Sequence, residues 1–352
     1  PSKMNYDQKQ SSKQYFADKE TETKKEPNKK EVVTPSKFTA NQNSFSALDS
    51  EAQNSENQKE ELKFFGVSEY YINEISQELI SKYGNYFIKN FGPKNLDVPP
   101  TDFMANHKIN PSIRSKMVNW MLEVFHSFGS SEETIFSAVK IMDKYLWKAK
   151  DKLKNEDVHL IGMVSMYLAS KTYDVTPIQM NNLIHLVGHN IFDQKTIKEM
   201  EKKIIKAIDF DVFCPTTYEF IQFILYDFYM NNKKAIIGLK LKKMLEILEN
   251  CSIFLAKMCN HFDNYSSVSP IYLSLTCVII GYDMMKDNCR ALTEEKQKFF
   301  KDWLQFLYSN IAKTQDIKND LEKIYKNIEN TYSEFNKMKL PNLVKYHDLY
   351  FD

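Results

Sequence analysis

The sequence predicts an all-α chain made of two tandem sets of five helices, preceded by one further helix and a disordered tail. Apolar residues recur every three to four positions over most of the chain, which is the period of an amphipathic helix. Only eight glycines and eleven prolines occur among the 352 residues, so little material exists for the many tight turns of an all-β chain. In each set the third helix is apolar nearly all round, which is typical of the central helix of a bundle.

Composition divides the chain into four segments, of which the first, residues 1–66, is expected to be a disordered tail. Up to about residue 60 the chain contains one leucine, no isoleucine and two valines, with ten lysines and ten acidic residues. Such a composition cannot bury enough apolar surface to offset the entropy lost on ordering. We expect a first domain over 67–213, a second domain over 214–340 and a C-terminal tail over 341–352.

The helix expected over 111–129 is the one around which the chain is organised. Asn110 can cap its start, Pro111 suits the first helical position, and Gly129 can supply the left-handed residue that ends it. The apolar stripe that other helices should cover consists of Ile113, Met117, Trp120, Met121, Val124, Phe125 and Phe128. The polar residues that lie off this stripe are Arg114, Lys116, Asn119 and Glu123.

The remaining helices follow from the same periodicity and from capping residues. A helix over about 69–90 precedes the two sets. The first set continues with a helix capped by Ser131, one that starts near Asn155, one after Thr176-Pro177, and one over about 193–209. The second set is expected over about 216–230, 235–261, 269–286, 293–313 and 317–337.

Charge and cysteine content argue against several classes of function. The net charge is +1, and Arg114 and Arg290 are the only arginines, which disfavours binding to nucleic acid. The five cysteines contain no C-x-x-C pair, so we expect buried free thiols in a reducing compartment rather than a zinc site. No apolar run is long enough to cross a membrane. We therefore expect an intracellular chain, in the nucleus, the cytoplasm or both, that binds neither nucleic acid nor membranes.

No catalytic arrangement is visible in the sequence. His185 and His189 are four apart, as in a zinc-protease helix, but Leu186 stands where that helix needs a glutamate. We expect these histidines at the surface of a helix end and no metal site. Since the chain also lacks a Gly-rich phosphate loop and a G-x-S-x-G motif, it is expected to be a binding module rather than an enzyme, with no cofactor.

For three residues, an ordinary explanation and a functional role both stay open. Lys171 closes a very apolar helix, where a cation can simply satisfy the last carbonyls. Glu201 can simply face water near Lys198. Thr34, followed by a proline and by Lys37, matches a proline-directed phosphorylation pattern, although such short patterns often occur by chance.

Several motifs, taken together, resemble the cyclin box. Residues 113–124, IRSKMVNWMLEV, resemble its opening helix, and residues 141–146, IMDKYL, resemble its second helix. Residues 168–171, LASK, resemble the end of its third helix. Residues 200–201 and 210–212, followed by 215–216, resemble its fifth helix and the entry to a second box. The order and spacing match those of the family, whose fold is two five-helix repeats, and the A/B type is the most similar.

This resemblance implies a regulatory subunit that binds and activates a cyclin-dependent serine/threonine kinase. In the family, the residues matching Lys171 and Glu201 form the centre of the kinase contact, and Leu160 lies on the same side. Tyr173 and Asp174 are expected to contribute to this contact. The implied mechanism is conformational: the cyclin packs on the αC helix of the kinase, so that the αC glutamate reaches the phosphate-holding lysine.

The resemblance also implies a stabilising pair and a docking groove. Arg114 and Asp143 are expected to pair inside the box. A groove that docks substrates carrying a docking motif is expected at Ile113, Lys116, Met117, Trp120 and Glu123. Lys116 stands where the family usually has an apolar residue.

Two departures from the family pattern keep a second function open. After the matching lysine the family often has Phe-Glu-Glu, whereas residues 172–174 are Thr-Tyr-Asp, and the tail contains no R-x-x-L destruction box. The alternative is a cyclin-fold adaptor or structural protein that does not activate a kinase. A DNA-binding cyclin fold is disfavoured by the near-zero net charge.

Overall fold

The computed structural model describes residues 97–213, 215–289, 292–338 and 340–351. Within these residues every regular element is a helix, and the only β-type pairing is an isolated bridge between Lys108 and Lys154. The prediction of an all-α chain is confirmed. The helix expected over 69–90, the tail expected over 1–66, and Thr34 lie outside the described residues.

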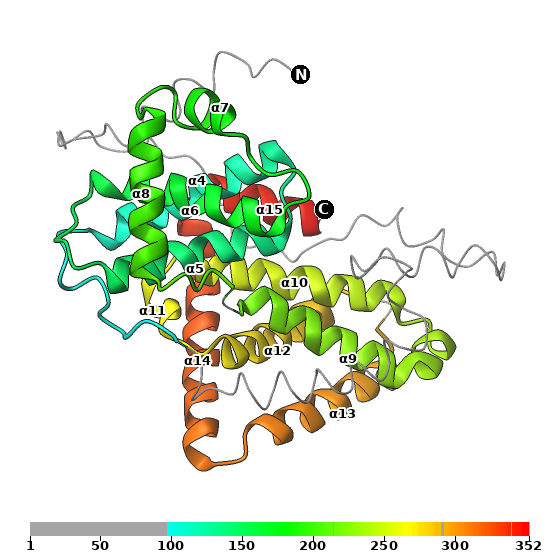
Figure 1. Cartoon of the computed structure of the whole chain (residues 1–352). Coiled ribbons are helices and arrows are strands. Elements are labelled where there is room, and N and C mark those ends of the chain that lie inside the picture. Colours follow the sequence, from blue (N-terminus) through cyan, green and yellow to red (C-terminus); the bar gives the residue numbers. More distant parts are fainter. Residues whose placement is uncertain (1–96, 214, 290–291, 339, 352) are drawn as a thin grey trace, which may run out of the picture.

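Helices α4 to α8 form the first set and lie together in the upper part of Figure 1. The bounds are Pro111–Phe128 for α4, Glu132–Lys148 for α5, Asp157–Tyr173 for α6, Met180–Asn182 for α7, which runs on into a π-helix over Leu183–Val187, and Gln194–Ala207 for α8. The third helix, α6, packs on α4, α5 and α8, and most of its residues are buried. Its place at the centre explains why it is apolar nearly all round.

Helices α9 to α14 form the second set, in the lower part of Figure 1. The bounds are Thr217–Gly238 for α9, Lys242–Asn260 for α10, Asp263–Ser266 for the short α11, Pro270–Asn288 for α12, Glu294–Ile311 for α13 and Gln315–Ser333 for α14, which a 3-10 turn over Phe335–Lys337 follows. Here α12 takes the central position, because it packs on α9, α10 and α14. The two sets therefore share one plan, with the central helix third in each when the short α11 is left out of the count.

Local capping explains where the two sets begin. At the start of α4 the Asn110 Oδ1 accepts the Ser112 N–H at 2.9 Å, and Gly129 ends the helix with a left-handed φ of 64°. At the start of α9 the Thr216 N–H donates to Glu219 Oε2 at 2.6 Å, and the Glu219 N–H donates to Thr216 Oγ1 at 3.3 Å. This reciprocal capping box satisfies two donors that the helix cannot, so the second set starts directly after the link between the sets.

Two helices differ from their expected bounds. The fourth helix was expected directly after residues 176–177 but begins only at Met180, because the Ile178 N–H donates to the Ser170 hydroxyl at 2.9 Å and this segment stays extended. In the second set, α9 continues to Gly238 through a kink at Asn232 (φ −123°, ψ 15°), where a break between two helices was expected.

The C-terminal residues 341–352, expected as a tail, contain helix α15, Pro341–Phe351, which returns to the first set beside α4 (Figure 1). The Asn342 Nδ2 donates to the Asn119 carbonyl at 3.0 Å, and the Leu343 N–H donates to Asn119 Oδ1 at 3.3 Å. Asn119 and Arg114 were placed off the stripe of α4 that other helices cover, but both are fully buried. The reason is that α15 and the second set cover a further face of α4.

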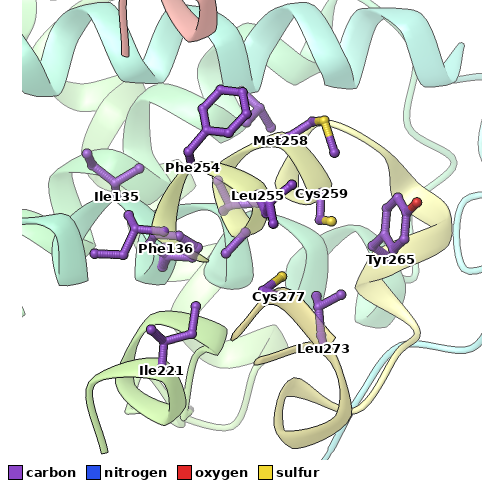
Figure 2. Close-up of a cluster of buried hydrophobic side chains, with 14 of the residues drawn as sticks. Ile135, Phe136, Ile221, Phe254, Leu255, Met258, Cys259, Tyr265, Leu273 and Cys277 are labelled. Atoms are coloured by element: carbon purple, nitrogen blue, oxygen red, sulfur yellow. The ribbon is translucent and has the colours of Figure 1, made fainter. Parts of the chain in front are cut away.

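One apolar core runs across both sets. Figure 2 shows Ile135 and Phe136 of α5 in the same cluster as Ile221 of α9, Leu255 of α10 and Cys277 of α12. The buried cysteines Cys251, Cys259, Cys277 and Cys289 are free thiols. Because first-set and second-set side chains share this core, the two sets are packed as one body.

A fully buried cation adds a polar link between the sets. Lys257 of α10 places its Nζ 2.6 Å from Glu132 Oε1 on α5 and 3.4 Å from the centre of the Tyr346 ring on α15. Burial lowers the pKa of Lys257 to about 8, although the Glu132 carboxylate acts in the opposite direction. A buried ammonium needs such partners, so α5, α10 and α15 are held at one point.

Candidate binding surface

The structure brings Lys171 and Glu201 together. Lys171 lies in the last turn of α6, Glu201 lies on α8, and their side chains form an ion pair. The Lys171 Nζ also lies 4.2 Å from the centre of the Tyr167 ring. The Lys171 side chain is 36% exposed and that of Glu201 is 18% exposed. Glu201 therefore pairs across two helices rather than simply facing water, and the lysine head group emerges at one point that a partner can reach.

Leu160 lies on the same face of α6 as Tyr167 and Lys171, since separations of seven and eleven residues are close to whole helical turns. It is half-buried and packs against the core. At 1.5 Å per residue it lies roughly 16 Å from Lys171 along the helix axis. Leu160 therefore stands at the other end of this face, away from the ion pair.

Exposed apolar side chains lie in links between helices. Val175 follows α6, and Phe210 and Phe213 lie between α8 and α9. Val175 is fully exposed, Phe210 is 72% exposed and Phe213 is 70% exposed. The Tyr173 ring meets the Phe213 ring edge-on, with 6.1 Å between centroids. Large apolar groups exposed in this way indicate an interaction site rather than a core.

The backbone at this surface is strained. Asp209 and Phe210 have φ angles of 54° and 61°, a left-handed conformation that costs a residue with a side chain roughly 1–2 kcal/mol. Strain of this kind is concentrated at functional sites. In the sequence, Phe210 stood out only as part of a motif, and Phe213 and Val175 did not stand out. The available signal was their position in short links between periodic segments.

Asp174 is placed differently from Tyr173. Its carboxylate accepts hydrogen bonds from the Ser131 N–H and from the hydroxyls of Thr134 and Ser170. These partners belong to the start of α5 and the last turn of α6, so the Asp174 carboxylate is engaged inside the first set.

The Arg114 and Asp143 side chains form a bidentate pair. The Arg114 Nε lies 2.7 Å from Asp143 Oδ1, and a terminal nitrogen lies 2.6 Å from Oδ2. The guanidinium also donates to the Asn260 carbonyl at 3.0 Å and to the Ser266 hydroxyl at 3.1 Å. Both members of the pair are buried. The pair therefore joins α4 to α5 and also holds the second set against the first.

The residues expected to form a docking groove are divided between core and surface. Met117 and Trp120 are buried, and Trp120 meets the His159 ring edge-on at 5.2 Å. Ile113 is half-buried, Lys116 is exposed and Glu123 is half-buried. Glu123 also accepts a hydrogen bond at 3.3 Å from Asn342 of α15. The structure therefore presents Ile113, Lys116 and Glu123 at the surface, with α15 next to Glu123.

His185 and His189 lie at the end of the π-helix, where His185 Nδ1 is 2.6 Å from Asn190 Oδ1. In the part of the chain that the structure describes, no group of three or more His, Cys, Asp or Glu side chains is arranged to hold a metal ion. None of the described helices combines the length and the apolar character that a bilayer span needs.

Comparison with known proteins finds a cyclin domain. A family model described as the N-terminal domain of cyclins matches residues 88–213, the stretch that contains α4 to α8. This part of the chain is a cyclin N-terminal domain. The G2/mitotic-specific cyclin-2 of Medicago sativa is 27% identical over 192 residues, which are 54% of this chain and 55% of that protein. Cyclin-B2-3 of Arabidopsis thaliana is 24% identical over 220 residues, which are 60% of this chain and 47% of that one.

The chain spans about half the length of the curated relatives that it matches. The X-ray structure of a viral cyclin from herpesvirus saimiri aligns with a TM-score of 0.50 at 16% identity, over 71% of this chain and 99% of that one. At this level of identity the alignment establishes a common fold, which agrees with the two helical sets described above.

Proposed function

We propose that this chain is a cyclin, a regulatory subunit that binds and activates a cyclin-dependent serine/threonine kinase. The observation that carries the proposal is the Lys171–Glu201 ion pair at the end of α6, where Tyr173, two residues after Lys171, meets the exposed Phe213 ring edge-on. A partner that covers this surface buries aromatic area and removes a charged pair from water, the combination found at the centre of tight interfaces. The expected localisation, nucleus or cytoplasm, is part of this proposal.

In the proposed mechanism the cyclin supplies a shaped surface and no chemistry of its own. It packs on the αC helix of the kinase, so that the αC glutamate pairs with the lysine that holds the ATP phosphates. The free energy of this packing shifts the kinase toward its active arrangement, because a partner can favour a state only through its differential affinity for it.

The first experiment identifies the kinase and tests the ion pair. The full chain is used to capture co-purifying kinases, and the affinity for the kinase found is then measured for Lys171→Ala and Glu201→Ala. Removing one member of a desolvated pair strands the other, which costs about 2–5 kcal/mol, or roughly 30- to several-thousand-fold in affinity. The double variant should be little weaker than either single variant, since the pair acts as a unit.

Lys243 and Glu246 on α10 form the matched control, because they are an ion pair with side chains 57% and 45% exposed. Lys243→Ala should leave kinase affinity and melting temperature nearly unchanged. Retained kinase binding by both folded variants, Lys171→Ala and Glu201→Ala, overturns the proposal.

The second candidate function is an adaptor that binds a kinase, or another partner, without activating it. The observation that favours it is that Asp174, at the position of an acid in the family motif, is engaged within the chain. Phosphate transfer by the purified complex distinguishes the two functions: tight binding without increased kinase activity supports the adaptor.

Substrates with a basic R-x-L docking motif should bind this cyclin weakly. The exposed Lys116 ammonium stands on the surface of α4 between Ile113 and Glu123, where it repels the arginine of such a peptide. Lys116→Ile should restore part of the affinity in a peptide titration. Tight binding by the unmodified chain would show that α4 accepts the peptide despite the lysine.

A further inference from the structure

The carboxylate of Asp174 joins the end of α6 to the start of α5. Its Oδ1 accepts the Ser131 N–H at 3.2 Å and the Thr134 hydroxyl at 2.5 Å, and its Oδ2 accepts the Ser170 hydroxyl at 2.9 Å. Both carboxylate oxygens are therefore used inside the chain. Ser131 and Thr134 lie at the start of α5, whereas Ser170 lies in the last turn of α6.

The partners of Asp174 are themselves fixed by further hydrogen bonds. Ser131 Oγ accepts the Thr134 N–H at 3.2 Å and lies 2.9 Å from Thr134 Oγ1. Because the Thr134 hydroxyl hydrogen goes to Asp174, the Ser131 hydroxyl is the donor in the second contact. Ser170 Oγ also accepts the Ile178 N–H at 2.9 Å. Thr134 and Ser170 are fully buried, so their hydroxyls cannot exchange these hydrogen bonds for bonds to water.

A carboxylate suits this position better than any neutral side chain of similar size. It lies at the N-terminus of α5, where the aligned peptide dipoles favour a negative charge. It accepts three hydrogen bonds without needing to donate one, and bonds to a charged acceptor are stronger than neutral ones.

We call the three hydrogen bonds accepted by the Asp174 carboxylate the clamp. The clamp lies next to Lys171, which the proposed function places at the centre of the kinase contact. Lys171 lies between Ser170 and Asp174, whose side chains bond to each other, and Asp174 ties this turn to the start of α5. The Lys171 Nζ is thereby kept between Glu201 and the Tyr167 ring. We propose that Asp174 is a positioning residue, which does not touch the kinase but holds the last turn of α6 so that Lys171 is presented correctly. This inference rests on the proposed function.

Two variants separate a positioning role from a direct contact. Asp174→Ala removes the carboxylate, and Thr134→Val removes a buried partner that no kinase can reach. Both should weaken kinase binding to a similar extent, about ten-fold for the loss of one well-placed hydrogen-bonded clamp. If Asp174→Ala weakens binding and a folded Thr134→Val does not, Asp174 contacts the kinase and the inference is overturned. Ser170→Ala replaces Thr134→Val should that variant fail to fold.

A double-variant cycle tests whether Asp174 acts through Lys171. The combination of Asp174→Ala with Lys171→Ala should bind no more weakly than Lys171→Ala alone, since the clamp has nothing left to position. Additive losses overturn the inference. Lys243→Ala combined with Asp174→Ala is the control, and there only the effect of Asp174→Ala should remain.

Amide hydrogen exchange of the free chain tests the clamp without any kinase. Asp174→Ala should increase exchange at residues 171–174 and at the start of α5 while leaving α12 protected, because local opening reports local contacts. Unchanged exchange overturns the clamp. A third outcome combines faster exchange in Asp174→Ala with full kinase binding by Lys171→Ala. It supports the clamp but overturns the proposed function.

Discussion

At the scale of single residues, Phe210 is a large apolar side chain that folding leaves exposed. Its ring is 72% exposed and its backbone is left-handed, so folding alone gains little from a phenylalanine here. We expect Phe210→Ala to lower kinase affinity by at least about 30-fold, the effect of an interface anchor, without lowering the melting temperature. Phe306→Ala on α13, where the ring is 67% exposed, is the control, and equal affinity of the two variants would contradict the prediction.

Glu133 carries a prediction about pH. Burial, together with the charge and hydrogen bond of Glu219, raises the pKa of Glu133 from 4.5 to about 7. Between these two values the folded chain keeps a proton that the unfolded chain has lost, so this group makes the free energy of unfolding fall as pH rises. Glu133→Gln should therefore melt at a higher temperature than the unmodified chain at pH 8, and the difference should shrink at pH 5. Glu294→Gln, at an exposed acid in the first turn of α13, is the control for a general charge effect.

Sequence reasoning at this scale was limited by what a residue type and a spacing can say. Lys171 ends a helix too apolar to expose its sides, a pattern that left its role open; the kinase contact came from the resemblance to the cyclin box and stays a prediction. Asp174 could not be placed, since its bonds to Ser131 and Thr134 depend on how the end of α6 meets the start of α5. The burial of Met117 and Trp120 likewise depends on neighbours that are distant in sequence.

At the scale of elements, the short helix α15 contributes to stability through a buried polar contact with α4. Asn342 donates to the carbonyl of Asn119 at 3.0 Å in a buried contact. We expect Asn342→Ala to lower the free energy of unfolding by about 1–3 kcal/mol, because a buried carbonyl loses its donor. Urea denaturation measures the effect, and Lys345→Ala, at an exposed position of the same helix, should change stability by less than about 0.5 kcal/mol.

The periodic helices could be predicted from the sequence, and α15 could not. The capped helices α4 and α5 carry their start and end signals in the adjacent residues. The contacts of α15 instead reach Asn119, 223 residues earlier in the chain. The sequence of the eleven residues of α15 does not reveal that this helix packs against Asn119.

At the scale of the whole molecule, the two sets should unfold together. They share an apolar core, the Arg114 contacts with Asn260 and Ser266, and the Lys257–Glu132 pair. We expect calorimetry to show one transition. In a Trp303→Phe variant, fluorescence from the two tryptophans of the first set should follow the same curve as the far-ultraviolet circular dichroism of the whole chain.

Arg114→Ala should lower the free energy of unfolding by about 3–5 kcal/mol, because it leaves Asp143 charged and buried without its partner. The loss should shift the whole transition. Two separate transitions, with only one of them moved by the substitution, would contradict the coupling of the sets. The fold class followed from periodicity, but this coupling did not, since Arg114, Asn119 and Lys257 are polar residues of the kind normally expected at a surface.

The return of α15 to α4 has a consequence for synthesis on the ribosome. Asn119 emerges 223 residues before Asn342, and at about 5–20 residues per second the interval is roughly 11–45 seconds. During that time the nascent first set exposes the Asn119 carbonyl and the face of α4 that α15 covers in the finished chain. The first set must therefore wait in an unfinished form, in which a chaperone can bind it. A chain released before α15 is made keeps that face open.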